Sequence, residues 1–213
     1  MSQRYPDLPA RMAALPVDHR GFPVPWFVAW VDGQPQFPVA DADKFEQAIR
    51  YRKCWVCGGQ LGKYGTYVIG PMCAVNRTSS EPPSHLDCAQ FSARNCPFLT
   101  RPRMKRVGRQ NLPIGSRDPA GEMIERNPGV ALVWTSTNGK PHRTRKGLLF
   151  DIGDPTGVEW YAHGRPATRE EVLVSIETGL PLLRDMADRD PHPEAANLEL
   201  NRYIDRAMLL VPA

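Results

Sequence analysis

The most constraining feature of the sequence is a pair of short motifs that contain cysteine and histidine. Cys54 and Cys57 form a C-x2-C pair, and His85 and Cys88 form an H-x2-C pair, with 25 residues between Gly58-Gly59 and His85. Three cysteines and one histidine are a donor set that holds tetrahedral zinc. Because His85 and Cys88 are three residues apart, one helical turn places both on the same face. The spacing predicts one structural Zn²⁺ per chain, bound by Cys54, Cys57, His85 and Cys88.

Two further cysteines leave alternative ligand sets open. Cys73 follows Gly-Pro-Met, and Cys96 precedes a proline. Either of these reserve ligands could replace His85 and give an all-cysteine site. The cysteines could also hold another metal group, such as an iron–sulfur cluster, or none. Because cysteine is among the most buried residue types, the default role of Cys73 and Cys96 is that of small core residues.

The chain shows no feature of an exported or membrane protein. It has no run of 18 apolar residues, and its first 20 residues lack the apolar segment of a secretory signal. We therefore expect a cytoplasmic protein without membrane association. Cysteines that cluster within residues 54–96 of such a chain favour metal binding over disulfides.

Local patterns predict an α+β fold. Strands are expected at 26–31, 36–39, 64–69, 130–135, 148–152 and 158–161, and helices from Asp41 or Asp43 to 52, at 85–95 with Ser84 as N-cap, and at 168–178, 181–189 and 194–210. We divide the chain into three parts. Residues 1–100 hold an N-terminal arm, a strand hairpin and the zinc module, residues 101–128 form a basic, proline-rich loop, and residues 129–213 form a small antiparallel sheet with C-terminal helices.

The order of elements around the cysteines resembles a treble-clef zinc module. A two-cysteine knuckle at 54–57 is followed by strands and then by a helix whose first turn carries His85 and Cys88. The resemblance covers residues 54–95 and implies a zinc-stabilised, treble-clef-like N-terminal half. It does not imply one activity, because treble clefs serve as nucleases, DNA or RNA binders and protein-interaction modules.

A wider set of residues resembles an uncharacterised group of bacterial and phage proteins. The likeness rests on three runs, Gly21-Phe22-Pro23-Val24-Pro25-Trp26-Phe27, Gly70-Pro71-Met72-Cys73 and Glu81-Pro82-Pro83-Ser84-His85. No activity is implied by this resemblance, which supports only the presence of a real domain.

The sequence gives little support to an enzyme. Four closely spaced ligands close the zinc shell, whereas a catalytic zinc keeps one position for water. The H-x-E and P-C-x-x-C motifs of zinc deaminases are not found in that order. A nuclease of the His-Asn-His type needs a histidine between the ligand pairs, and residues 58–84 contain none. Asn76 and Arg77 are the residues to test if the chain is a metal-dependent nuclease after all.

Positive charge is concentrated in the first 150 residues. They contain 21 Lys and Arg against 11 Asp and Glu, whereas residues 151–213 contain 6 against 12. Such asymmetry is typical of a protein that meets a polyanion, or of one whose acidic helices dock on its own basic part. Two basic loops are expected, at 101–109 and 140–146. Their phosphate-binding candidates are Arg101, Arg103, Lys105, Arg106, Arg109, Arg143, Arg145 and Lys146.

We therefore expect a non-enzymatic zinc-binding protein that associates with nucleic acid through basic loops. The alternative is a protein-interaction adaptor, such as a regulatory factor in a phage or host complex. The adaptor hypothesis predicts an exposed apolar patch, for example around Trp55 or in the proline-rich arm. A metal-dependent nuclease is the third hypothesis.

Overall fold

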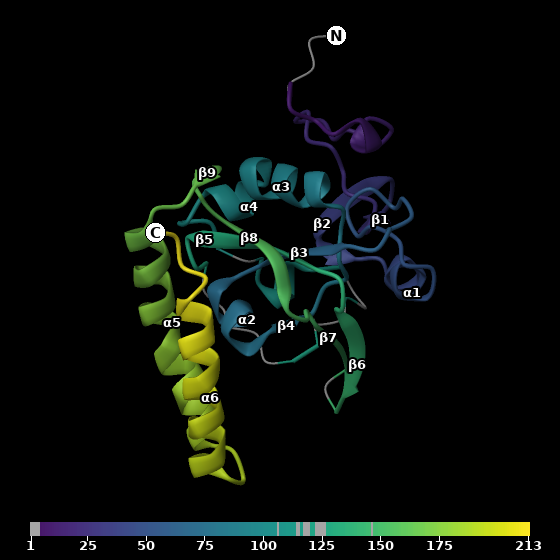
Figure 1. Ribbon diagram of the computed structural model, residues 1–213. Coiled ribbons are helices and arrows are strands. Elements are labelled where there is room, and N and C mark those ends of the chain that lie inside the picture. The colour runs from purple at the N-terminus through teal and green to yellow at the C-terminus, as the bar shows by residue number, and fades with distance from the viewer. Residues whose placement is uncertain (1–4, 106, 114–115, 117–119, 122–126, 146) are drawn as a thin grey trace.

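The computed structural model describes residues 5–105, 107–113, 116, 120–121, 127–145 and 147–213. Within these residues the strands form three antiparallel sheets, and helices pack on both faces of the largest one (Figure 1). The predicted α+β class is confirmed. None of the helices in this described part combines the length and the apolar character that a membrane span requires.

The largest sheet organises the molecule. Its strands have the order β3 (Gly65–Ile69), β5 (Val130–Ser136), β8 (Pro155–Ala162) and β9 (Arg165–Pro166). One face is covered by α2 (Pro71–Asn76), α5 (Arg169–Asp188) and α6 (Pro193–Met208), and the other by α3 (Leu86–Asn95) (Figure 1). Because both faces of β5 are covered, its sequence is a nearly continuous apolar run rather than an alternating one.

The two faces of β5 bury different residues. Leu132 and Trp134 point into the main core with α2, α5 and α6. Val133 points the other way and packs against Ala89 and Ala93 of α3. The small alanine side chains bring α3 close to the sheet, and this contact sets the position of the helix N-terminus. The metal-ligand candidates lie at that end of α3.

Two smaller sheets complete the fold. One has the order β4 (Thr78–Ser79), β7 (Gly147–Asp151) and β6 (Lys140–Thr144), and the other pairs β1 (Val28–Val31) with β2 (Gln34–Ala40). The hairpin β1–β2 leads into α1 (Ala42–Arg50), whose predicted N-cap Asp41 accepts a hydrogen bond from the Lys44 N–H. The remaining elements are η1 (Ala10–Met12), α4 (Pro97–Thr100) and η2 (Arg109–Asn111).

The predictions for residues 168–189 and for residues 140–146 are wrong. The capping box of Thr168 and Glu171 opens α5 as expected, but the helix continues through Gly179 and Pro181 to Asp188. The apolar face of α5 packs along its length, and this packing outweighs the cost of an internal proline. Residues 140–144 are a strand rather than a basic loop. β6 is an exposed edge strand without apolar alternation, so its sequence carries no strand signal.

The segment between the two ligand pairs is not a simple hairpin. β3 pairs with β5 in the large sheet, whereas β4 pairs with β7 in another sheet, and α2 lies between β3 and β4 in the chain. β3 therefore joins residues on both sides of the predicted 101–128 loop in one sheet. The three-part division of the chain stays a prediction, but its first and last parts share this sheet.

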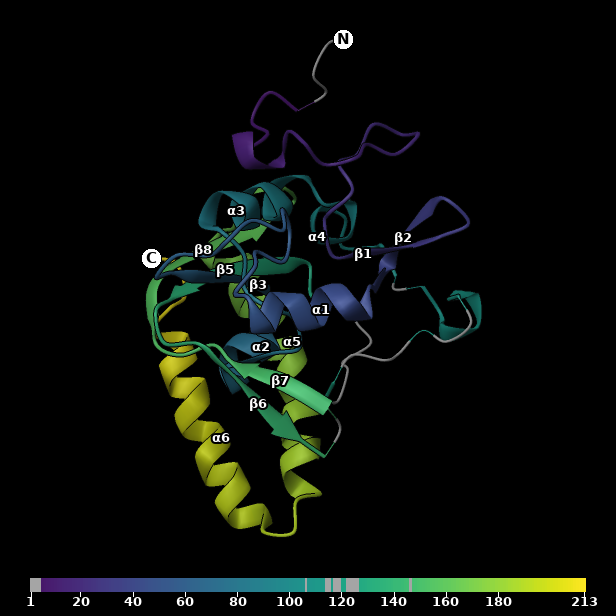
Figure 2. The same cartoon turned by 90° about the vertical axis from the view of Figure 1, so that its right-hand side faces the viewer.

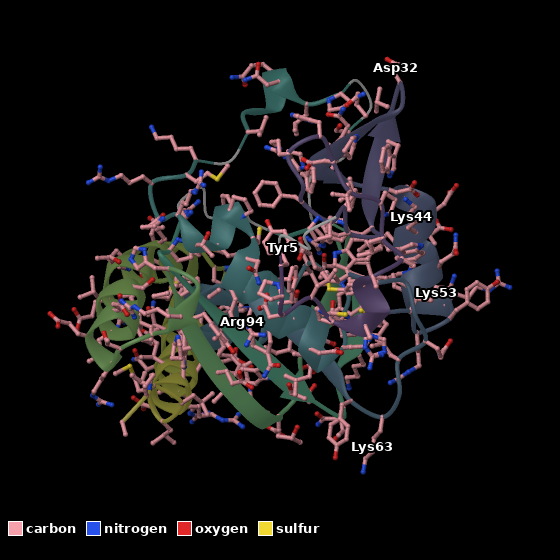
Figure 3. The ribbon with its side chains drawn as sticks, turned by 90° about the horizontal axis from the view of Figure 1, so that it is seen from above. Tyr5, Asp32, Lys44, Lys53, Lys63 and Arg94 are labelled. Atoms are coloured by element: carbon pink, nitrogen blue, oxygen red, sulfur yellow. The ribbon has the colours of Figure 1, made fainter. Side chains whose placement is uncertain are left out.

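The N-terminal arm is docked on the molecule. Tyr5, labelled in Figure 3, packs edge-on against Phe91 of α3, with ring centroids 5.4 Å apart. Asp7 pairs with Arg94 at 3.4 Å, and Arg11 pairs with Asp87 at 2.8 Å. The arm contains the short 3-10 turn η1. The arm thus lies over the same helix that carries Cys88.

Candidate metal centre

Glycines shape the loop that carries the first two cysteines. The Gly58 N–H donates to the Cys54 carbonyl at 2.9 Å, and the Cys54 N–H donates to the Gly59 carbonyl at 2.7 Å. Gly58 has a φ of +73°, a conformation that other residues adopt only at a cost. A Cβ atom on Gly58 would also lie 2.7 Å from the Trp26 ring. The predicted tight turn is therefore required both by backbone geometry and by this contact.

The second ligand pair is positioned by the large sheet. Ser84, the residue before His85, exchanges two backbone hydrogen bonds with Thr66 of β3, at 2.7 and 2.9 Å. The N-cap of α3 is His85 rather than the predicted Ser84. Ser84 instead ends the extended segment that pairs with β3. This pairing brings His85 and the first turn of α3 to the knuckle.

The four predicted ligand atoms converge on one point. The donor atoms of Cys54, Cys57, His85 and Cys88 all lie within 4.8 Å of one another. The Cys57 Sγ and His85 Nδ1 atoms are 3.4 Å apart. His85 Nε2 lies 3.0 Å from the Gln60 carbonyl oxygen, which can only accept a hydrogen bond. Nε2 therefore carries the proton, and Nδ1 presents its lone pair to the cysteines, as in histidine ligands held by a backbone carbonyl.

The sulfur of Cys54 is set up to be a thiolate. It accepts hydrogen bonds from the backbone N–H groups of Cys57 at 3.4 Å and His85 at 3.3 Å. Hydrogen bonds from the Cys57 and Cys88 thiols, followed by these backbone donors, hold the pKa of Cys54 well below its usual range. The same sharing raises the pKa of Cys57 and of Cys88. Without a cation, one thiolate forms easily and further negative charge is opposed.

A small apolar cluster surrounds the cysteines. Cys54 and Cys88 are 0% exposed, and they pack with Met12 of the arm and with Val56, Leu61 and Phe91. The arm therefore covers the buried side of the site, whereas Cys57 and His85 remain partly exposed. No sequence pattern pointed to Met12, because the proline-rich arm lacks periodicity. The contribution of Gln60 is a backbone carbonyl, which no sequence motif reveals.

Cys73 and Cys96 lie outside the cluster formed by the described residues. Cys73 is in α2 and packs against the main core. Cys96 ends α3, and burial raises the pKa of its thiol. Both positions match the default expectation of small, partly buried core residues.

Comparison with protein-family models, curated proteins and solved structures found no match. The resemblances to treble-clef modules and to bacterial and phage proteins therefore rest on the sequence motifs alone. The shared geometry of the four donor atoms is the observation on which a functional assignment depends.

The basic residues from the two predicted loops have different structural settings. Arg101, Arg103 and Lys105 are exposed in the loop after α4, and Arg143 and Arg145 are exposed on and beside β6. Arg106, Lys146 and the side chain of Arg109 lie outside the described part of the chain. Residues 120–121 lie beside Gly147 and Leu149 of β7.

Trp55 is not an exposed aromatic. It is 3% exposed, and its ring stacks on Phe27 at 4.8 Å and meets Phe45 edge-on. A patch around Trp55 is therefore wrong. Trp30 on β1 is the exposed tryptophan, at 44%. β1 belongs to a two-stranded sheet and has only one neighbouring strand. The Trp30 side chain is therefore less covered than the tryptophans of the large sheet.

Asn76 and Arg77 do not form a catalytic pair with the cysteine cluster. Asn76 is the exposed last residue of α2. Arg77 lies over the Trp134 ring, 5.3 Å from its centroid, and pairs with Asp154 at 2.9 Å. Through these contacts the arginine links the main core to a surface loop, which is a structural role.

Proposed function

We propose that Cys54, Cys57, His85 and Cys88 bind one structural zinc ion. A tetrahedral zinc ion with Zn–S bonds of about 2.3 Å needs donor atoms about 3.8 Å apart. The observed spread of up to 4.8 Å, with 3.4 Å between Cys57 Sγ and His85 Nδ1, requires only small movements of side chains. A divalent cation would also compensate the negative charge of three thiolates, which repel one another when no cation is bound.

The role of this ion is to hold the fold. All four donors come from the protein, and two of them are completely buried, so the arrangement favours a closed site over one with a water ligand. The ion would cross-link the knuckle to the first turn of α3. It would thereby fix the small apolar cluster onto which the arm docks.

The finer assignment is a treble-clef-type element with an enlarged insert. The knuckle and the N-terminal turn of the ligand-bearing helix have the treble-clef order. The strands between them depart from it, because they pair in separate sheets and enclose α2. This departure links the zinc site to the main core of the protein.

We further propose that the protein associates with nucleic acid through its basic segments. Arg101, Arg103, Lys105, Arg143 and Arg145 are exposed, and none forms an ion pair with another residue of the described part. Arg106, Arg109 and Lys146 extend the same segments in sequence. Exposed cations without a carboxylate partner attract phosphates and release their counterions, with little reading of base sequence.

The test is binding of a fluorescent oligonucleotide at several salt concentrations. We expect affinity for single- and double-stranded DNA and for RNA to fall steeply between about 50 and 200 mM salt. The double variant Arg143→Gln/Arg145→Gln should lower the slope of log K against log salt by about 2. Its matched control, Arg184→Gln/Arg202→Gln, removes two exposed arginines from α5 and α6 and should leave the slope unchanged. Binding that does not depend on salt would reject this proposal.

A protein-interaction adaptor is the second candidate, favoured by the exposed Trp30 and Val31 of the β1–β2 hairpin. A partner captured by the native protein should survive nuclease treatment and be lost with Trp30→Ser. Retention of the partner by Trp30→Ser, or its loss with nuclease alone, would count against this surface.

A further inference from the structure

A cavity lies between α1, the large sheet and the β6–β7 hairpin, and Leu61 of the small apolar cluster is part of its wall. Its volume is ≈ 70 Å³. Its wall includes the end of α1 and the residues after it, the start of β3, the end of β5, and the facing residues of β6 and β7. Figure 2 shows α1, β6 and β7 together on the face toward the viewer. The cavity is thus formed by segments that are far apart in the sequence.

A buried hydroxyl group in the cavity wall lacks a partner. Ser136 at the end of β5 is 1% exposed, and its Oγ has no hydrogen bond to any described residue. The neighbouring Thr135 points to the opposite face of the sheet, where its hydroxyl bonds to that of Thr66 at 3.0 Å. Leaving a buried hydroxyl unpaired is costly, so the Ser136 position indicates a missing acceptor or donor.

A second hydroxyl lines the same cavity. Tyr67 of β3 lies opposite Trp134, and Gly65 lies opposite Ser136, so the alternation of the strands places Tyr67 and Ser136 on one face. A Cβ atom on Gly139 would collide with the Tyr67 hydroxyl, which explains the glycine there. Burial raises the pKa of Tyr67 to about 12, and Asp151 adds to the rise. The phenol therefore stays protonated and able to donate at neutral pH.

Two of the residues that line the cavity carry positively charged side chains. Arg52 and Lys63 are both exposed and both belong to its wall. One of the five N–H donors of Arg52 binds the Gly62 carbonyl at 2.9 Å. Lys63, labelled in Figure 3, extends outward at the edge of the molecule. Among the described residues that line the cavity there is no aspartate or glutamate, so the wall offers donors and positive charge to an anion.

We propose that this cavity binds a phosphate group. A phosphate carries several strong acceptor oxygens that match the hydroxyls of Ser136 and Tyr67 and the charges of Arg52 and Lys63. The volume fits one such group and excludes a nucleobase. Apart from Thr137, the rest of the wall is apolar and includes Ile49 and Phe150, which lowers the local dielectric and strengthens the charged hydrogen bonds. The ligand that carries this group is inorganic phosphate, a mononucleotide or the phosphorylated end of an oligonucleotide.

The test uses the full-length protein as purified, titrated with inorganic phosphate at constant ionic strength. We expect saturable shifts of the backbone amide signals of residues 65–67 and 136–139. Lys63→Gln should weaken phosphate binding about tenfold, as loss of one charged hydrogen bond does. Ser136→Ala should weaken it about as much while leaving the melting temperature unchanged or higher, because the unpaired hydroxyl is gone. Lys140→Gln, which changes an exposed lysine of β6 that is not among the lining residues, is the matched control.

The outcomes separate this site from the basic segments. Binding that is about tenfold weaker in both wall variants and unchanged in Lys140→Gln supports the proposal. Comparison of inorganic phosphate, a mononucleotide and oligonucleotides with a 5′-phosphate or a 5′-hydroxyl then identifies the source. No saturable phosphate shift, or equal shifts in all variants, overturns the proposal. Neither result depends on Arg143 and Arg145, so failure of nucleic-acid binding by those residues leaves the cavity test intact.

Discussion

The two apolar clusters of this protein are stabilised in different ways. The main core is built from large side chains of the sheet and of α2, α5 and α6, such as Leu132, Trp134 and Ile152, all 0% exposed. The small cluster has Met12, Val56, Leu61 and Phe91 around Cys54 and Cys88. Apolar burial can stabilise the first by itself, whereas a cluster of the second size usually needs a metal or a disulfide. If the four candidate ligands bind a metal ion, the positions of their donor atoms matter more for the formation of the small cluster than the apolar area that it buries.

The largest effect should follow from removing one proposed ligand, since Cys88→Ser breaks the metal site but leaves the main core intact. Binding of structural zinc contributes about 10–16 kcal/mol in zinc-finger peptides, so its loss should unfold the small cluster. We expect backbone amides of residues 5–27 and 54–61 to lose hydrogen-exchange protection while β5 and α5 keep theirs. Cys96→Ser, outside the cluster, should keep the metal. Equal loss of protection in β5 would show that the two regions are one cooperative unit.

The converse change is Leu132→Ala in the main core. Truncation of a fully buried leucine costs about 2–5 kcal/mol of unfolding free energy. We expect a lower urea midpoint for the sheet and for α5, with metal content unchanged in the folded protein. Exposed Leu198 on α6 gives the control, since Leu198→Ala should change the midpoint little. Metal loss from folded Leu132→Ala would contradict the separation of the two regions.

A smaller effect is expected from Gly58→Ala, which strains the knuckle without removing a donor. The positive φ and the contact with the Trp26 ring should together cost about 1–3 kcal/mol. A competition titration with a chelator should show weaker metal binding, while the urea midpoint of the main core stays the same. At Gly62 a Cβ atom meets nothing within 4 Å, so Gly62→Ala is the matched control. Equal metal affinity in the two variants would contradict the role of this turn.

The smallest effect is expected at low pH, where Glu171 on the main-core helix α5 becomes protonated. Hydrogen bonds from Arg165, at 2.7 and 2.9 Å, and then from the Thr168 N–H lower the pKa of Glu171 to about 2. Because this pKa is depressed below the ordinary 4.5, the pairing stabilises the folded state above pH 4.5 and is lost as pH falls through about 2. Solvent screens this surface pair, so its contribution to the stability of the folded state is small.

Glu171→Gln should therefore lower the melting temperature slightly at pH 7 and should not lower it at pH 2. Glu177→Gln, an exposed glutamate of the same helix, serves as the control. Metal affinity should be the same in both variants, since α5 lies in the other region. A destabilisation of equal size at both pH values would contradict the linkage.

Local motifs carried most of what could be predicted. The spacing of Cys54 and Cys57 and that of His85 and Cys88 was sufficient to identify the four ligand candidates, because a tight turn and one helical turn dictate the geometry within each pair. The two pairs meet through the long-range pairing of the extended segment before α3 with β3. Long-range packing was not predictable from local patterns. The continuation of α5 through Pro181, the exposed strand β6 and the docking of Met12 on the cysteines all depend on partners distant in the sequence. The cavity around Ser136 has the same origin.

The most direct test of the account is the metal content of the natively purified protein. Elemental mass spectrometry should find one zinc ion per chain. After chelation, hydrogen exchange should show loss of protection in residues 5–27 and 54–61 while β5 remains protected. Protein that contains no metal, yet keeps the arm and the knuckle protected, would contradict the claim that a metal ion holds the small cluster together.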